Sequence, residues 1–171
     1  MDKATRTELR RTFLIADLPE PLTRASAHLQ LFDNYISNTR IRLRSIRDPE
    51  TKKWTRILQK RDNDSGFGKV EYAEIFLDDA EYERFEIFEG TEIRKNRYPF
   101  EFDGRRYDLD VYLWPLWGLN TAIVCFDDEA EMHDFVPPEF LIREITADRF
   151  YLGENLVGRS IEEVHANVAA K

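Results

Sequence analysis

Short stretches of alternating apolar and polar residues, each bounded by residues that favour turns, make up most of this chain. Such alternation is typical of a β-strand, because successive side chains point to opposite faces. Stretches of this kind lie at residues 8–15, 29–36, 39–46, 53–60, 69–77, 91–98, 106–113 and 119–126, and a shorter one lies at 141–146. A fold built mainly from strands is therefore expected.

The turns between these stretches indicate how the strands are connected. Ser37 and Asn38 predict a tight turn between two antiparallel strands, and Asp103 with Gly104 predicts another. Residues 62–68 are rich in Asp, Asn and Gly and predict a loop. About eight strands in this succession, with a few helices between them, predict the α+β class and an antiparallel sheet that can close into a barrel.

Three segments carry helix signals. Asp78 is expected to cap a helix that continues to about residue 88, and the acidic first turn of that helix suits its dipole. Residues 127–135 predict a second, short helix that ends before a pair of prolines. Ser160 and Glu163 form the ends of a capping box for a third helix, over about 160–170. We expect these helices at the periphery of the sheet.

Length and charge exclude several classes of partner. The 171 residues suit one domain, residues 1–171, and carry a formal net charge of −8. An acidic chain lacks the basic footprint needed to bind duplex DNA or an anionic membrane through its general surface. Any basic residues that bind phosphate must therefore be gathered in one place.

Signals for export or membrane insertion are also missing. Residues 1–11 are charged and contain no apolar segment of a signal peptide. No stretch approaches the roughly 18–20 apolar residues of a membrane span. Cys125 is the only cysteine, which excludes an intrachain disulfide. We expect a cytoplasmic protein.

Basic residues alternate in one of the expected strands, at Arg40, Arg42 and Arg44. The strand period of two places their side chains on one face. That face is either a solvated surface paired with nearby acids, or part of a cationic lining suited to a polyanion. Further basic residues within expected strands are Lys60, Lys69, Lys95 and Arg97.

The order and spacing of several motifs resemble the CYTH domain, also called the triphosphate tunnel metalloenzyme family. This family includes inorganic triphosphatases, thiamine triphosphatases and one class of adenylate cyclases. Residues 8–14, Glu-Leu-Arg-Arg-Thr-Phe-Leu, stand where the family has Glu-x-Glu-x-Lys followed by Phe-Leu. The other matching segments are Arg42-Leu43-Arg44, Lys60, Lys69-Val70-Glu71-Tyr72, Lys95-Asn96-Arg97-Tyr98, Asp108-Leu109-Asp110-Val111-Tyr112, Gly118-Leu119, and Glu144-Ile145-Thr146-Ala147-Asp148 with Tyr151. The resemblance covers about residues 7–157.

This resemblance implies an antiparallel eight-stranded β-barrel, or tunnel, with a few peripheral helices. In the family, inward Arg and Lys side chains hold a triphosphate, and inward Glu side chains hold two divalent metals. Arg offers a planar fork of donors to phosphate oxygens, and Lys offers a point charge. The residues expected to bind phosphate are Arg42, Arg44, Lys60, Lys69, Lys95 and Arg97. Asp108 and Asp110 either orient these cations, which we expect, or bind metal.

The sequence departs from the family pattern mainly at its acidic positions. Arg10 stands in place of the second Glu and Thr12 in place of the Lys of the first motif, and other expected Glu positions hold Ala73, Ile123 and Cys125. The carboxylates that remain for metal binding are Glu8, Glu71 and Glu144. They predict at most one metal, Mg²⁺ or Mn²⁺, because a two-metal site needs several converging carboxylates.

The substituted positions leave alternatives open. Arg10 either pairs with Glu8 or Glu71, which we expect because unpaired buried charges are costly, or contacts phosphate where a metal would lie. Ile123 and Cys125 either form an apolar patch for a ligand or belong to a filled part of the tunnel. We expect Cys125 to be a buried structural thiol.

Three functions are compatible with these residues. The favoured one is a tunnel protein that binds a triphosphate, polyphosphate or nucleotide, with metal-dependent hydrolysis lost or weak. The second is an active divalent-metal-dependent triphosphatase with a reduced carboxylate set. The third is an interaction module in which the tunnel is closed. The expected partner is a small polyanion, and a homodimer or a protein partner remains open.

Overall fold

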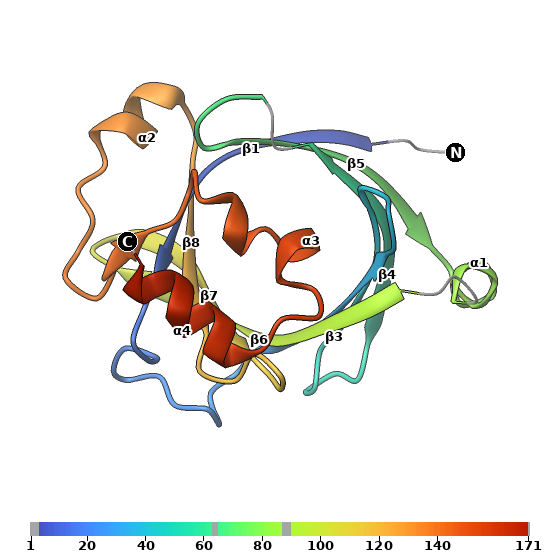
Figure 1. Ribbon diagram of the computed structural model, residues 1–171. Helices are drawn as coiled ribbons and strands as arrows, with labels where there is room; N and C mark the ends of the chain where they lie inside the picture. Colours follow the sequence, from blue (N-terminus) through green and yellow to red (C-terminus); the bar gives the residue numbers. More distant parts are fainter. Residues whose placement is uncertain (1–3, 63–64, 87–89, 171) are drawn as a thin grey trace.

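The strands close into a barrel in the computed structural model, which describes residues 4–62, 65–86 and 90–170 (Figure 1). Eight antiparallel strands form the ring in the order β1-β5-β4-β3-β2-β6-β7-β8, and β8 returns to β1. Their bounds are β1 Ala4–Leu14, β2 Leu29–Ile36, β3 Ile41–Arg47, β4 Trp54–Asp62, β5 Lys69–Leu77, β6 Gly90–Phe102, β7 Arg105–Tyr112 and β8 Asn120–Phe126. The expected α+β class and eight-stranded antiparallel barrel are confirmed.

Strand β1 closes the ring because it pairs with two different neighbours. Its residues 4–9 pair with β5, and its residues 9–14 pair with β8. The stretch expected as a strand at 141–146 shortens to β9, Arg143–Glu144, which pairs with the end of β1. Every strand of the ring therefore has two partners, and the barrel has no free edge between β1 and β5.

The predicted tight turns have backbone conformations that suit their residues. Asn38 has φ of 60°, in the left-handed region that Asn tolerates better than most residues. Asp103 and Gly104 both have positive φ, 49° and 71°, as a two-residue hairpin turn of this kind requires. The loop expected at 62–68 includes residues 63–64, which lie outside the described residues.

Short helices lie around the barrel. Their bounds are α1 Asp79–Phe85, α2 Glu129–Asp134, α3 Gly153–Leu156 and α4 Ile161–Ala169, with a 3₁₀ turn at Arg149–Tyr151. Asp78 and Ser160 form the capping boxes of α1 and α4. The predicted end of the first helix, near residue 88, lies outside the described residues. No helix in the described part of the chain is long and apolar enough to cross a membrane.

The apolar core lies mostly outside the barrel wall. Leu109 and Val111 of β7 are buried, and they pack on the outer face with residues of β6, β8 and α2. A second cluster joins the β7–β8 turn to α3 and α4. Because side chains alternate along β7, this packing turns Asp108 and Asp110 to the inside. The outer face supplies the hydrophobic stabilisation and leaves the inner face free for polar residues.

Candidate functional site

The interior of the barrel is a cavity of about 450 Å³, lined by side chains from all eight strands of the ring. This volume falls within the range of small-molecule sites, about 300–1,000 Å³. Residues 145–156 also border the cavity, and α3 lies across the barrel opening in Figure 1. Side chains do not fill the interior, which disfavours the interpretation of a closed tunnel.

One wall of the cavity is organised by Asp33. Arg44 donates two hydrogen bonds to its carboxylate, from Nε at 2.6 Å and from Nη2 at 2.7 Å. Arg42 places Nη1 at 3.5 Å from the same carboxylate. Burial would raise the pKa of Asp33, but Arg44 and Arg42 hold it far below its usual range. A buried carboxylate therefore neutralises and orients two guanidinium groups.

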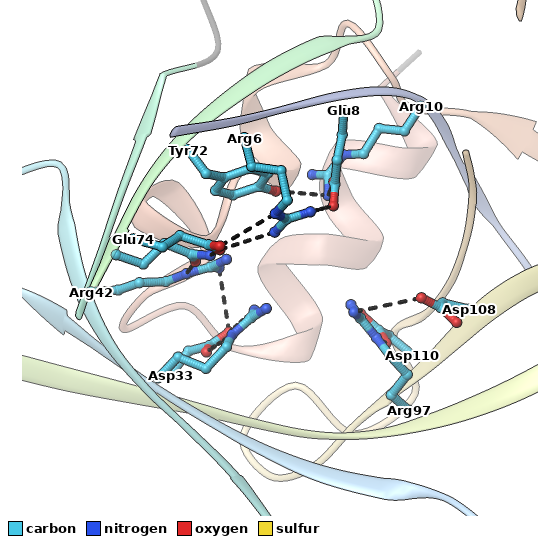
Figure 2. Close-up of polar contacts among 12 residues, drawn as sticks. Arg6, Glu8, Arg10, Asp33, Arg42, Tyr72, Glu74, Arg97, Asp108 and Asp110 are labelled. Atoms are coloured by element: carbon cyan, nitrogen blue, oxygen red, sulfur yellow. Dashed lines mark hydrogen bonds and ion pairs between the residues drawn. The ribbon is translucent and has the colours of Figure 1, made fainter. Parts of the chain in front are cut away.

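The strand register extends this wall into a longer network. Gln59 of β4 lies directly opposite Arg42 of β3 on one side and Glu74 of β5 on the other. Arg42 donates to the amide oxygen of Gln59, whose amide nitrogen donates to Glu74. Glu74 in turn accepts two hydrogen bonds from Arg6 of β1, at 3.0 Å and 3.3 Å. Figure 2 shows Arg6, Arg42 and Glu74 of this network close together inside the barrel.

Asp110 organises the adjoining wall, formed by β6 and β7, since β6 pairs with β2. Arg97 donates to it from Nε at 2.7 Å and from Nη2 at 2.8 Å, and the Lys95 ammonium lies 2.7 Å away. Asp108 adds a weaker ion pair with Arg97 at 3.8 Å. Burial lowers the pKa of Lys95 to about 8, although the nearby Asp110 opposes the shift. This wall repeats the design of the first, with one buried carboxylate beneath two cations.

A third group joins Arg10, Tyr72 and Arg61. Arg10 donates to the Tyr72 hydroxyl at 3.0 Å and lies 3.5 Å from Glu8, so it forms the ion pair expected of it. The buried Nε of Arg61 has no hydrogen-bond partner. Burial lowers the pKa of Arg61 to about 10, helped by Arg10. Burial would raise the pKa of Tyr72, yet Arg10 and Arg61 lower it to about 7.

The structure brings together five of the six cations expected to bind phosphate. The residues that border the cavity are Arg42, Arg44, Lys69, Lys95 and Arg97. Arg40, the third member of the alternating set, precedes β3 and forms an exposed ion pair with Asp62 at 3.4 Å.

The expectation that Lys60 lies in the tunnel is wrong. Lys60 is exposed on the outer face of β4, and the adjacent Arg61 faces the cavity instead. Lys69 does border the cavity, and its ammonium lies 3.9 Å from the half-exposed Glu71. On β4 the polar pattern allowed either face to be the inner one.

The three carboxylates expected to bind metal do not converge. Glu8 faces the cavity and is held by Arg6 and Arg10. Glu71 lies on the outer face of β5, as does Ala73, since the inner face carries Tyr72 and Glu74. Glu144 lies on β9, where it pairs with Arg11 at 2.6 Å. These positions contradict the expectation that Glu8, Glu71 and Glu144 share one site.

A divalent metal does not fit the donors that are present. Among the described residues, no group of three or more His, Cys, Asp or Glu side chains could hold a metal ion. The substituted positions Ile123 and Cys125 do face the cavity, so carboxylate ligands are missing where the family pattern has Glu, whereas Thr12, which also faces it, stands in place of a Lys. The expected burial of Cys125 is wrong, because its side chain is exposed to the cavity.

Sequence reasoning missed several residues of the site. Asp33, Tyr72, Arg6 and Arg61 were not singled out as members of the lining, nor was Glu74 as a partner of Arg6. Asp33 carried a usable signal, because it shares the face of β2 with Leu31 and Tyr35, which are apolar or aromatic. A carboxylate on an otherwise apolar strand face indicates a buried partner of opposite charge.

Known proteins resemble the chain over most of its length. No protein-family model matches it. The inorganic triphosphatase of Nitrosomonas europaea is 28% identical over 156 residues, covering 88% of this chain and 96% of that protein. The inorganic triphosphatase of Acetivibrio thermocellus is 27% identical over 152 residues, covering 88% and 92%.

Solved structures agree with this similarity. A crystal structure of an inorganic triphosphatase has a TM-score of 0.60 and 27% identity, covering 88% of this chain and 93% of that one. A crystal structure of a hypothetical protein has a TM-score of 0.61 at 24% identity, which supports the fold alone.

The closed antiparallel barrel with a cation-lined interior defines a tunnel protein. Together with the similarity to inorganic triphosphatases over most of its length, this architecture fits a CYTH, or triphosphate tunnel, domain.

Proposed function

We propose that the tunnel binds inorganic triphosphate or a chemically related polyphosphate, including the phosphate chain of a nucleotide. One observation carries this proposal. Nine basic and five acidic residues border the cavity, whereas the chain as a whole has a net charge of −8. An acidic protein that gathers an excess of cations in its interior is suited to an anionic ligand of high charge.

The buried carboxylates support this function by orienting the cations. Arg44 and Arg97 each use Nε and Nη2 to bind an aspartate. A guanidinium has five N–H donors, so each of these arginines keeps donors for a second acceptor. Side chains fixed in this way lose little further freedom when a phosphate oxygen binds.

Triphosphate hydrolysis is the second candidate function, favoured by the names of the two relatives. Against it stands the position of the carboxylates, since Glu8 is held by arginines and Glu71 and Glu144 lie elsewhere. Binding without efficient hydrolysis is therefore the function we favour.

Thermal unfolding with tripolyphosphate and with ATP, each with and without Mg²⁺ or Mn²⁺, tests both candidates when phosphate release is measured in parallel. A ligand at about 100 times its dissociation constant should stabilise the fold by roughly 2.7 kcal/mol. Metal-dependent phosphate release would favour the triphosphatase. The absence of stabilisation by either ligand, with and without metal, would refute binding in the tunnel.

A double variant locates the ligand. Replacing Arg42 and Lys95 with Gln removes one cation from each wall of the cavity and should abolish the stabilisation by tripolyphosphate. Arg40→Gln is a matched control, because Arg40 lies outside the cavity and is exposed. Stabilisation that survives the double variant would place the ligand elsewhere.

A further inference from the structure

Three arginines occupy the side of the tunnel where β1, β5 and β4 are neighbours. Arg6 of β1 and Arg61 of β4 both lie directly opposite Tyr72 of β5 in the strand register. Arg10 reaches the same tyrosine through its hydroxyl, at 3.0 Å. We call Arg6, Arg10 and Arg61 the guanidinium cluster.

Arg6 lies between the two carboxylates on this side of the tunnel. It donates to Glu8 through Nη1 and to Glu74 through Nε and Nη2 (Figure 2). The positively charged group that joins these carboxylates is therefore a guanidinium of the chain itself. A metal ion that entered between them would have to displace Arg6.

Arg10 and Arg61 make this side still less favourable for a metal cation. Arg10 lies 3.5 Å from Glu8, so a metal ion bound to that carboxylate would be close to a second positive charge. Like charges at such separations repel strongly in a partly buried site. In the described chain no ion pair joins Arg61 to a carboxylate, and its buried Nε is without a hydrogen-bond partner.

A buried donor without a hydrogen-bond partner lowers the stability of a protein, unless a bound ligand accepts from it. Arg61 borders the cavity, so its free donor is available to a ligand oxygen. Anions relieve the repulsion among Arg6, Arg10 and Arg61, whereas cations increase it. The cluster therefore selects an anion.

We propose that the guanidinium cluster takes the place of divalent metal in this tunnel, so that the chain binds inorganic tripolyphosphate without any metal. Arg61 contacts a terminal or bridging phosphate oxygen through its unpartnered Nε, while Arg6 and Arg10 supply the positive charge that a metal ion would otherwise bring. This inference rests on the proposed function of the tunnel as a polyphosphate site.

Calorimetric titration of the whole chain with tripolyphosphate tests the inference, first in EDTA and then with Mg²⁺, using the free tripolyphosphate concentration in each case. We expect dissociation constants that differ by less than tenfold, or 1.4 kcal/mol. We also expect no Mn²⁺ binding to the protein alone, measured by electron paramagnetic resonance. Binding that occurs only with metal, or a protein-bound Mn²⁺ signal, would overturn the inference and leave the proposed function intact. No binding in either buffer would refute both.

Arg61→Gln isolates the contribution of the cluster. Because its Nε has no partner in the fold, this variant should unfold at the same or a higher temperature while its affinity for tripolyphosphate in EDTA falls at least tenfold. Lys60→Gln is the matched control, since Lys60 is the adjacent residue and is exposed on the outer face. An unchanged affinity in Arg61→Gln would contradict the inference.

Arg10→Glu supplies a test in the opposite direction. The substitution places a second carboxylate beside Glu8 and removes one guanidinium, which restores the residue type of the family pattern at that position. We expect it to lose affinity in EDTA by at least tenfold and to recover part of that loss when Mg²⁺ is added. Equal affinity with and without Mg²⁺ at the wild-type level would show that Arg10 does not replace the metal.

Discussion

Replacing Asp110 with Asn removes the carboxylate that neutralises one wall of the tunnel. Asp110 is 0% exposed and accepts from Arg97 at 2.7 and 2.8 Å and from Lys95 at 2.7 Å. The counter-charges that remain are Asp108, at 3.8 Å from Arg97, and Asp33, which acts on both cations. Removing one partner of a buried ion pair typically costs about 3–5 kcal/mol, because the other charge stays buried without compensation.

The expected cost lies toward the lower end of that range near neutral pH. Burial already lowers the pKa of Lys95 to about 8, and the loss of Asp110 lowers it further, so Lys95 can lose its proton and its charge. Arg97 cannot lose its proton in this way and stays charged. At roughly 2–4 °C per kcal/mol for a chain of this length, the unfolding temperature should fall by about 6–12 °C. The loss should be larger at lower pH, where Lys95 stays charged in the folded variant.

Urea unfolding followed by circular dichroism measures this effect, and thermal unfolding gives the pH series. Asp134→Asn is the matched control, because Asp134 is exposed at the end of α2 and its loss should change stability by less than about 0.5 kcal/mol. Tripolyphosphate should stabilise Asp110→Asn more than the wild type, since the ligand restores negative charge to the wall. A variant as stable as the control would refute the claim that Asp110 compensates two buried cations.

Three further predictions concern pH, the tunnel opening and the outer face. In the folded state the pKa of Tyr72 is about 7 and that of Lys95 is about 8, both below the values in the unfolded chain. The unfolding temperature of the free protein should therefore rise between pH 7 and 9, while its affinity for tripolyphosphate falls. The same trend in both measurements would contradict this assignment. Gly153→Ala should destabilise the fold by about 1–3 kcal/mol in urea unfolding, because the added methyl group would collide with the Tyr35 side chain. Adding Tyr35→Phe to this variant distinguishes the collision with the hydroxyl group from the collision with the ring. Glu71→Gln should leave tripolyphosphate binding unchanged in calorimetry, since Glu71 lies on the outer face. A tenfold loss of affinity would show that Glu71 takes part in the binding site.

The strand pattern predicts the barrel well, but it predicts the inner face only where one face is plainly apolar. Lys95 and Arg97 are recognisable as inward residues because Tyr98 and Phe100, on the opposite face of β6, pack in the outer core. On β4, Lys60 and Arg61 are adjacent basic residues, and either could face the cavity. Hydrophobic alternation carries no information where both faces are polar.

The pairing of charges across strands depends on register, which a single sequence does not reveal. Asp33 meets Arg44, and Asp110 meets Arg97, because these residues lie directly opposite one another in neighbouring strands. Each pair joins residues that are separated by a turn or hairpin of variable length. The composition of the site could therefore be predicted in part, whereas its ion pairs required the three-dimensional structure.

The distribution of these ion pairs explains how the tunnel can be both stable and ready to bind. An empty barrel lined only by cations would carry a large repulsive energy. Asp33 and Asp110 remove most of that repulsion on two walls, and the arginines they orient keep spare donors. On the remaining side, Arg61 has no carboxylate partner among the described residues, and Tyr72 has its pKa lowered to about 7 by the neighbouring guanidinium groups. The uncompensated positive charge is thus concentrated beside Arg61, where a bound phosphate oxygen would gain the most.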